Sequence, residues 1–505
     1  MNEELNKAFD EISDDFINEA AGYQKNRFPW LKAIAVALAV IVSWTAIWAA
    51  LDFPPNFIYD PDPTVPTIIG KPKPQYPSNL GSIQSPGTLQ LSNMVAAPMY
   101  PQMAQYPDHK TVEPFSDAYY AQLSKWLDSQ AAQYDQPEGY ADSLNEFWSR
   151  SIAQFLSGEG NRAYSPANVY MALAMLAETT GGNSRQQILD LLGADTIESL
   201  QTQAGHVWNA QYSNDGNCTS LLANSLWLDD AYRFNDSAIQ SLVDHYFTSI
   251  FNGDLGSEET NEQLRAWINS QTGGLLQEQT ENLELSKEAV FALASTIYFT
   301  AGWGEEFDPA LTADQVFHCK NGDLTTPFIN KNIRFGTYYR GSNFGAVQLE
   351  LSKGNMWLIL PDEGMTVNEI LAGEEYLTMA LAPYRWENQK SIKINLSLPK
   401  FDISSQADLI DGMKALGLSD IFNEHKSDFT PITDADELAV GKIDHAVRVA
   451  INEEGVAAAG YTVIEVKDTG IPMPPKDEID FVLNRPFLFL VTDDIPLFAG
   501  VVEQP

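Results

Sequence analysis

The chain contains little cysteine and histidine, which excludes several kinds of site. Two cysteines, Cys218 and Cys319, occur in 505 residues, too few for a disulfide-stabilised scaffold or a structural zinc site. One disulfide is possible by count, but free thiols are the expectation. The six histidines are scattered and form no H-E-x-x-H pattern. The sequence therefore predicts no metal site.

Basic residues are also few. Thirty lysines and arginines oppose 68 aspartates and glutamates, for a formal net charge of -38 at pH 7. Such a chain repels phosphate backbones, so nucleic acid is not an expected partner. A solvated acidic surface is the simpler interpretation of this charge, and attraction of basic protein partners is the alternative.

Motifs that specify an enzyme are missing. The sequence has no P-loop, no G-x-G-x-x-G and no G-x-S-x-G pattern, so neither a cofactor nor a catalytic group is predicted. A hydrophobic fraction of 44% over 505 residues allows a sizeable core. That length fits one large domain or two to three ordinary ones.

An apolar run near the N-terminus predicts a transmembrane anchor over residues 30–51. Residues 33–51 carry no charge, and 19 positions are enough to cross a bilayer. Basic side chains before the run predict an N-terminus inside the cell: Lys25, Arg27 and Lys32. A cleaved signal peptide is the main alternative, although no A-x-A pattern precedes Asp52. A buried helix is the second alternative.

The segments on either side of this anchor differ in character. Residues 1–29 are acidic, with apolar residues at helical spacing, which predicts an amphipathic segment in the cytoplasm. Residues 52–115 hold 13 of the 28 prolines, a composition that favours an extended extracellular stalk. A compact domain is predicted over 116–505. The expected protein is thus a single-pass protein of the cell membrane with its domain outside.

Helical and strand patterns alternate within this domain without a repeat. Residues 144–156, "LNEFWSRSIAQFL", place their apolar side chains on one helical face, whereas "YMALAMLA" (170–177) is apolar all round and predicts a buried helix. Residues 391–399 and 446–452 alternate with period two, as half-buried strands do. Together these patterns predict a large α+β domain.

Several segments, in order along residues 116–505, resemble the serpin family of serine protease inhibitors. They are "YSPANVYMALAMLA", "STIYFTAGW", "LPKFDISSQADL", "LGLSDIFNEHKSDFTPIT", "EEGVAAAGYTVIEVKDTGIPMPP", "NRPFLFLV" and "PLFAGVV". The resemblance implies large mixed β-sheets surrounded by helices, an exposed reactive-centre loop and a monomer without cofactors. It also implies suicide inhibition, in which a serine protease cleaves the loop and stays covalently bound while the loop inserts into the main sheet. We expect a bacterial, membrane-anchored member.

Residues 453–466 match the hinge and inserting strand of this family. The implied hinge comprises Glu453, Glu454, Gly455, Val456, Ala457, Ala458, Ala459 and Gly460. One alternating face carries no charge and can be buried: Val456, Ala458, Gly460, Thr462, Ile464 and Val466. Gly455 offers backbone freedom at the bend. The alternative is a surface hairpin strand followed by a proline-rich turn.

The cleaved bond is placed by counting. From Gly455 the family spacing puts it at Thr469–Gly470, whereas counting back from Phe481 puts it a few residues later. A threonine before the cut suits the narrow apolar pocket of elastase-like or subtilisin-like proteases. Lys467 would suit a trypsin-like enzyme but lies two residues early.

The resemblance assigns two further groups of residues. The sheet-opening region comprises Ser165, Asn168, Ser295 and His445, where Ser295 replaces the family's asparagine. The top of the sheet, or breach, comprises Trp303, Lys400 and Glu453. Glu453 and Lys400 either pair there or are separately solvated.

Two alternative functions remain open. A non-inhibitory serpin would act as a protease substrate or a binding protein. A membrane signalling protein would use the outer domain as a sensor and residues 1–29 as the effector.

Overall fold

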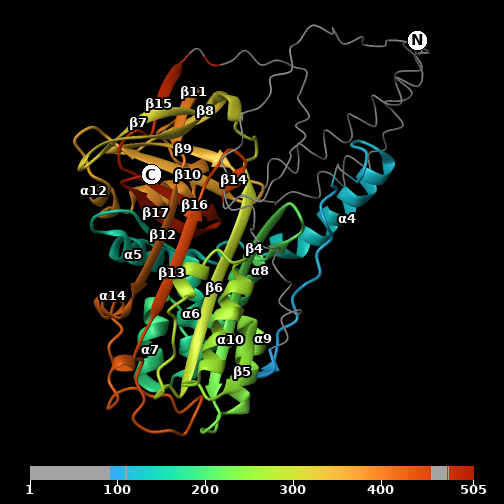
Figure 1. Cartoon of the computed structure of the whole chain (residues 1–505), viewed down its shortest axis with the longest axis vertical. Helices are drawn as coiled ribbons and strands as arrows, with labels where there is room; N and C mark the ends of the chain where they lie inside the picture. The colour runs from blue at the N-terminus through green and yellow to red at the C-terminus, as the bar shows by residue number, and fades with distance from the viewer. Residues whose placement is uncertain (1–90, 109–110, 457–474, 476) are drawn as a thin grey trace. The chain divides into compact units, whose positions relative to one another are not determined.

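The computed structural model describes residues 91–108, 111–456, 475 and 477–505 (Figure 1). The predicted anchor over residues 30–51 and the start of the predicted stalk lie outside these ranges. No helix within them combines the length and the apolar character needed to cross a bilayer.

Two groups of strands lie side by side, and we call them together the divided sheet. In the larger part the order is β1 (Met94–Ala96), β5 (Thr248–Gly253), β4 (Cys218–Asp229), β6 (Phe291–Gly302) and β14 (Gly455–Val456), with β3 (Ser213–Asn214) paired to β4. The smaller part is the antiparallel pair β12 (Asp402–Asp408) and β13 (Asp444–Ala450). In Figure 1 this pair runs alongside β6, on the side away from β4.

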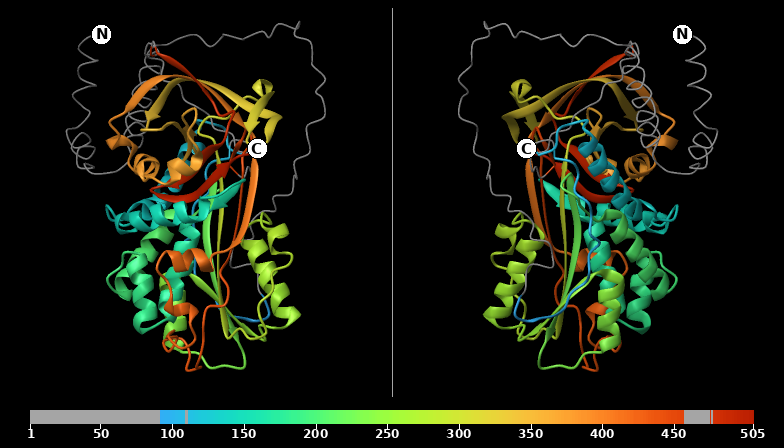
Figure 2. Two further views of the ribbon diagram at one scale, coloured as in Figure 1. Left: turned by 90° about the vertical axis from the view of Figure 1, so that its left-hand side faces the viewer. Right: turned by 90° about the vertical axis from the view of Figure 1, so that its right-hand side faces the viewer.

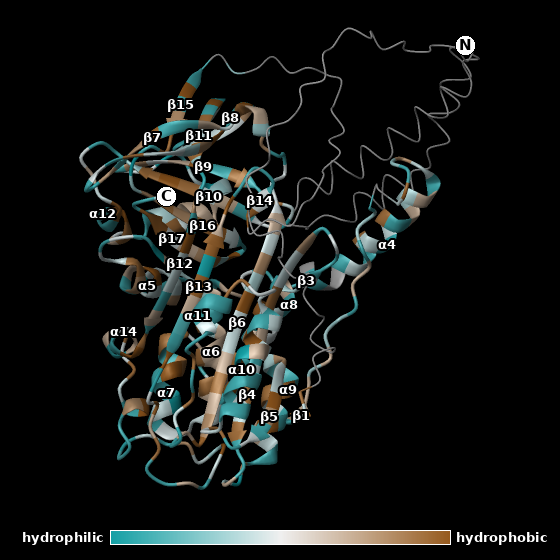
Figure 3. Ribbon diagram, viewed as in Figure 1, coloured by the Kyte–Doolittle hydropathy of each residue, from teal (hydrophilic) through white to brown (hydrophobic). Residues whose placement is uncertain are grey.

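A second sheet contains the most apolar strands. Its order is β15 (Glu478–Val482), β11 (Gln389–Pro399), β8 (Gly322–Arg340), β9 (Phe344–Glu350), β10 (Asn355–Pro361), β16 (Phe487–Asp493), β17 (Ile495–Val502) and β2 (Arg162–Tyr164), with β7 (Ala313–Cys319) paired to β8. Strands β16 and β17 are buried on both faces, which explains their continuous apolar sequences (Figure 3).

Helices pack on the divided sheet and on the second sheet. They are α4 (Asp117–Tyr134), α5 (Asn145–Leu156), α6 (Pro166–Thr179), α7 (Gly182–Leu191), α8 (Ile197–Gln211), α9 (Asp236–Tyr246), α10 (Glu258–Gln271), α11 (Gln277–Thr280), α12 (Val367–Leu371), α13 (Glu375–Leu381) and α14 (Ile410–Ala415). Helix α6 packs on one face of β6 and α10 on the other (Figure 2). The predicted α+β class is confirmed.

Helix α6 confirms the buried helix predicted from "YMALAMLA". Ser165 caps its N-terminus by accepting a hydrogen bond from the backbone N–H of Asn168, and Pro166 occupies its first turn. Nearly all its side chains are buried, since sheets and helices surround it. A polar face would have no water to contact in this position.

The first described residues differ from the predicted stalk, which was expected to reach residue 115. Met94 pairs with Phe251 and Ala96 with Ile250, so β1 is the edge strand of the sheet next to β5. The backbone groups of β5 would otherwise be unpaired on that side, and β1 satisfies them. The part of the chain that belongs to the fold therefore begins before the predicted boundary at residue 116.

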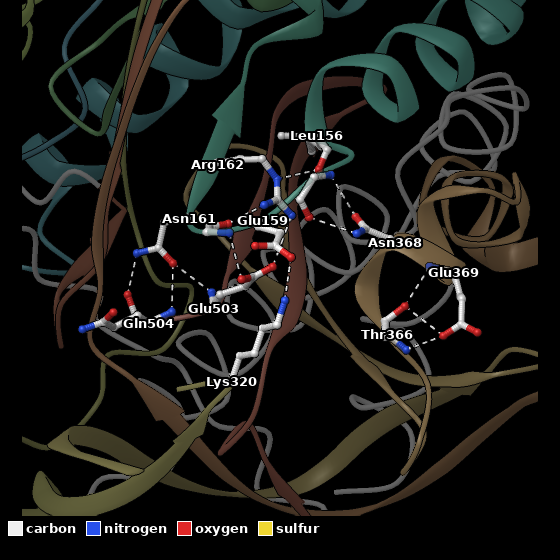
Figure 4. A network of polar contacts seen from close by, with 12 residues as sticks. Leu156, Glu159, Asn161, Arg162, Lys320, Thr366, Asn368, Glu369, Glu503 and Gln504 are labelled. Atoms are coloured by element: carbon white, nitrogen blue, oxygen red, sulfur yellow. Dashed lines mark hydrogen bonds and ion pairs between the residues drawn. The ribbon is translucent and has the colours of Figure 1, made fainter. Parts of the chain in front are cut away.

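The C-terminus is held by the loop between α5 and β2 (Figure 4). The Asn161 side chain accepts hydrogen bonds of 2.8 and 2.9 Å from the backbone N–H groups of Glu503 and Gln504 and donates one of 2.5 Å to the Gln504 carbonyl. The Gly160 N–H donates to the Glu503 carboxylate over 2.8 Å. These bonds extend the pairing of β17 with β2 beyond its last residue.

Candidate functional site: the hinge and the opening of the sheet

The described start of the hinge is a short strand at the top of the divided sheet. Gly455 pairs with Gly302 and Val456 with Ala301, both antiparallel to β6. Val456 also bridges Ile451, the residue that follows β13. The chain therefore turns back after β13 and begins a new strand between β13 and β6.

Gly455 is required here for space. A Cβ at this position would lie 2.2 Å from the carbonyl oxygen of Ala301 and 2.8 Å from Cα of Gly302. Gly455 is absent from the described glycines with positive φ. The predicted reason, backbone freedom at the bend, is thus replaced by the close approach of two backbones.

Val456 is the first side chain of this new strand that points into the core. It is 2% exposed, whereas the neighbouring Glu454 is exposed. The remaining predicted loop positions lie outside the described residues: Ala457, Ala458, Ala459, Gly460, Thr462, Ile464, Val466, Thr469 and Gly470.

Asn452 sets the turn that precedes this strand, and the sequence analysis did not identify it. Its side-chain oxygen accepts hydrogen bonds of 2.8 Å from the Glu454 N–H and 3.1 Å from the Gly455 N–H. Its own N–H donates to the Gly455 carbonyl over 3.1 Å. An asparagine two residues before a bend is a turn signal, so "NEEG" carried the information.

The two charges predicted at the breach form an ion pair. The Lys400 ammonium lies 3.0 Å from the Glu453 carboxylate, and the two side chains are only 11% and 16% exposed. The Thr312 hydroxyl donates to the same carboxylate over 2.8 Å. Burial pushes the pKa of Glu453 upward, but Lys400, a backbone N–H and Thr312 together hold that pKa below its usual value.

Trp303 fastens the turn from the other side. Its indole N–H donates to the Asn452 carbonyl over 2.8 Å, and its backbone N–H donates to the Glu454 carbonyl over 3.0 Å. Its ring meets Phe307 edge to face at 5.5 Å. All three predicted breach residues therefore contact the hinge turn or lie in it.

The four predicted sheet-opening residues also come together. The Ser165 hydroxyl donates to the Leu497 carbonyl over 2.7 Å, and the Ser165 N–H donates to Nε2 of His445 over 3.1 Å. The Asn168 amide donates to the Ser295 hydroxyl over 2.9 Å. Ser295, which replaces the family's asparagine, is therefore bonded to α6 from β6.

His445 is neutral in this environment. Burial lowers its pKa to about 4, and its ring packs edge to face on Tyr164 at 5.3 Å. A neutral imidazole can accept the Ser165 N–H, whereas a protonated one cannot. Helix α6 is thus connected to β13 through His445 and to β6 through Ser295.

The facing edges of the two sheet parts complete the site. In the described residues β6 pairs only with β4 and β14, and β13 pairs in a ladder only with β12. Strand edges carry backbone groups that a further strand can satisfy. The described start of the hinge, Gly455–Val456, lies between these two edges and is paired to β6.

The two cysteines form no disulfide with each other. Both are free thiols, with Cys218 buried and Cys319 partly exposed. Burial raises the pKa of Cys218 to about 12, which leaves it protonated and unreactive near neutral pH.

Comparisons with known proteins agree with this geometry. The family described as "Serpin (serine protease inhibitor)" matches residues 143–505. Serpin-ZX of Arabidopsis thaliana is 28% identical over 380 residues, covering 70% of this chain and 95% of that protein. Alpha-1-antiproteinase 2 of Equus caballus is 28% identical over 360 residues, covering 69% and 82%.

A solved structure supports the fold. The thermophilic serpin Tengpin in its native state superposes with a TM-score of 0.65 at 23% identity, covering 74% of this chain and 95% of that one. At this level of identity the likeness concerns the fold alone.

Proposed function

The chain belongs to the serpin family, and from this membership we propose that it inhibits serine proteases as a suicide substrate. The observation that carries the proposal is the hinge geometry. Val456 is paired to Ala301, bridged to Ile451 and buried, so the loop's first inserting residue already occupies a strand position.

The chemistry is supplied by the protease. Its serine hydroxyl attacks the carbonyl carbon of Thr469, the Thr469–Gly470 bond breaks, and the Gly470 amine takes up a proton and leaves. The product is an ester between the protease and Thr469. The inhibitor contributes no catalytic group, because its task is to prevent the hydrolysis of that ester.

The inhibitor would prevent this hydrolysis by inserting the freed loop into the sheet. Successive residues after Val456 would extend the antiparallel pairing with β6, alternating between the buried face and the exposed face. Fourteen steps of roughly 3.3 Å carry the ester about 45 Å from the top of the sheet. The attached protease is pulled against the inhibitor and distorted before water hydrolyses the ester.

The choice of target follows from Thr469. A small β-branched side chain suits a narrow apolar pocket, so we propose elastase-like or subtilisin-like proteases. The anchor at residues 30–51 would hold the domain outside a bacterial cell, where such enzymes act on exposed proteins. The net charge of -38 would speed association with cationic proteases.

One experiment tests the proposal. The purified full chain is mixed with an elastase-like protease and with a subtilisin, and the products are examined on denaturing gels and by mass spectrometry. We expect a covalent complex and a released C-terminal peptide whose mass places the cut at Thr469–Gly470. Protease with its serine chemically blocked is the control and should form no complex. Complete cleavage without a complex, for several proteases, would establish a substrate instead.

A further inference from the structure

The described chain extends well before the region that matches the family. That region starts at residue 143, yet residues 91–108 and 111–136 already pack on the domain. We call these two ranges the N-terminal brace. It contains β1 and α4, and the proposed inhibition mechanism uses neither.

The brace first contacts the edge of the divided sheet. Besides the β1 pairing, the Asn252 N–H donates to the Asn93 carbonyl over 3.0 Å. Further along, the Tyr100 ring stacks on Trp208 at 5.2 Å and on Tyr212 at 5.8 Å. Burial raises the pKa of the Tyr100 hydroxyl, as expected for a side chain enclosed by the domain.

The strongest anchor of the brace is Asp215, in the turn between β3 and β4. Asp215 is 2% exposed. One of its carboxylate oxygens accepts two hydrogen bonds of 2.7 Å, one from the Trp126 indole N–H and one from the Gln130 amide. Its other oxygen accepts the backbone N–H groups of Asn217 and Cys218, each at 2.9 Å. Four donors satisfy a buried charge, and two of them belong to α4.

The turn that holds Asp215 leads directly into Cys218, which lies in the same row of paired residues as Val456 of the hinge. Cys218 of β4 pairs with Ala301 of β6, and Ala301 pairs with Val456. Ser352 adds a second link, because its N–H donates to the Gly302 carbonyl over 2.8 Å and its hydroxyl donates to the Asn217 carbonyl over 3.3 Å. These bonds connect the turn to the strand next to the hinge, so a movement of the turn would act on that strand.

The brace also contacts helix α8. Helix α4 packs on α8, and the Gln136 side chain lies 2.7 Å from Nδ1 of His206 on α8. Trp126 and Gln130 bind the turn of β4 from the same segment that binds α8. A shift of β4 relative to α8 would break these bonds.

We propose that the N-terminal brace slows insertion of the loop when no protease has cut it. Insertion must separate β6 from β13, and β6 is paired to β4 from Phe291 to Ala301. Because the brace ties β4 and β5 to α8, it opposes the movement that opens the sheet. This inference rests on the proposed function, since it concerns the regulation of the same site.

The test uses the full chain and a measurement that needs no protease. The variant combines Trp126→Phe, which keeps the ring against Tyr106, with Gln130→Met, which keeps the length of the side chain. Asp128→Asn, at an exposed position of the same helix, is the matched control. Spontaneous loop insertion is followed during warm incubation as the appearance of a monomer that resists urea on native gels. Hydrogen exchange of residues 117–134 and 213–217 reports release of the brace.

We expect the double variant to convert about tenfold faster than the parent, with faster exchange in both segments, and the control to match the parent. Faster exchange without faster conversion would overturn the proposal. Unchanged exchange and conversion would also overturn it, because Asp215 would then not be the anchor. Asp215→Asn supplies a second variant, because its amide nitrogen cannot accept, so either the two α4 donors or the two backbone N–H groups lose their acceptor. Failure of the parent itself to form covalent complexes would instead count against the proposed inhibition.

Discussion

The backbone N–H of Ser165 donates a hydrogen bond of 3.1 Å to Nε2 of His445. This bond joins the start of α6 to β13, next to the region where the proposed mechanism opens the sheet. It requires an unprotonated nitrogen, and burial lowers the pKa of His445 to about 4. The bond therefore connects the acidity of the medium to the stability of the closed region.

The first prediction follows from this pKa. An unfolded chain protonates histidine near pH 6.5, while folded His445 resists protonation down to about pH 4. The unfolded state therefore binds more protons in this interval. The contribution of His445 to the free energy of unfolding is fully present above pH 6.5 and falls by about 3 kcal/mol as the pH drops to 4. Urea unfolding of the parent and of His445→Gln, which accepts the same bond without titrating, should diverge below pH 6.5. Parallel stability curves would contradict this prediction.

The second prediction concerns the hinge. Val456→Arg should convert an inhibitor into a substrate, because the first inserting side chain would bring an unpaired charge into a position that is 2% exposed. The measurement is the fraction of protease captured as covalent complex per loop cleaved, which should fall about tenfold or more. Glu363→Arg, at an exposed residue outside the hinge, is the control and should still capture protease. Equal capture by both variants would mean that Val456 does not lead the insertion.

The third prediction concerns the breach. Lys400→Met leaves the Glu453 carboxylate nearly buried without its cation and should lower the free energy of unfolding by about 1–3 kcal/mol. Adding Glu453→Gln should recover part of this loss, because the unpaired charge is removed. Lys390→Met is the control, since its pair with Asp477 is well exposed, and it should cost about 0–1 kcal/mol. Additive losses in the double variant would show that the pair is not coupled.

The fourth prediction concerns the C-terminus. Asn161→Ala removes the side chain that bonds Glu503 and Gln504 and should lower stability by about 1 kcal/mol. Hydrogen exchange should accelerate at residues 500–504, since these bonds protect the end of β17. Gln186→Ala, which removes an exposed bond within α7 to Asp190, is the control and should leave that exchange unchanged. No local change in exchange would rule out the role assigned to this loop.

The fifth prediction concerns target choice. Thr469→Arg should shift complex formation from elastase-like toward trypsin-like proteases, because an arginine before the cut fits a pocket that ends in a carboxylate. The ratio of association rates for the two protease classes measures this shift. An unchanged ratio would place the scissile bond elsewhere between residues 467 and 475. The mass of the released peptide would then identify it.

Local pattern was sufficient to predict much of the fold and part of the site. The run "YMALAMLA" predicted a buried helix, because it leaves no polar face, and α6 confirms it. Alternation over 391–399 predicted a strand, and β11 confirms it. The absence of charge on one face of the hinge predicted that Val456 could be buried, as it is.

Other features became visible only in three dimensions. Met94–Ala96 is a three-residue strand in a proline-rich region, and without a period of its own it could not be separated from the stalk. Asp215 is one of 68 acidic residues, and nothing local distinguishes it from the solvated ones. Its role depends on Trp126 and Gln130, which lie 89 and 85 positions away.

The difference between the features that the sequence predicted and those that only the tertiary structure revealed has a physical reason. Side-chain periodicity determines which face of a segment avoids water, and that preference is a property of the segment alone. Which strand pairs with which, and which carboxylate meets which donor, depends on contacts between residues distant in sequence. The sequence by itself therefore determined the buried helix, the strands and the uncharged face of the hinge. Only the tertiary structure decided that Val456 lies in one row with Ala301 and Cys218, and that a segment before the family's domain is bonded to that row.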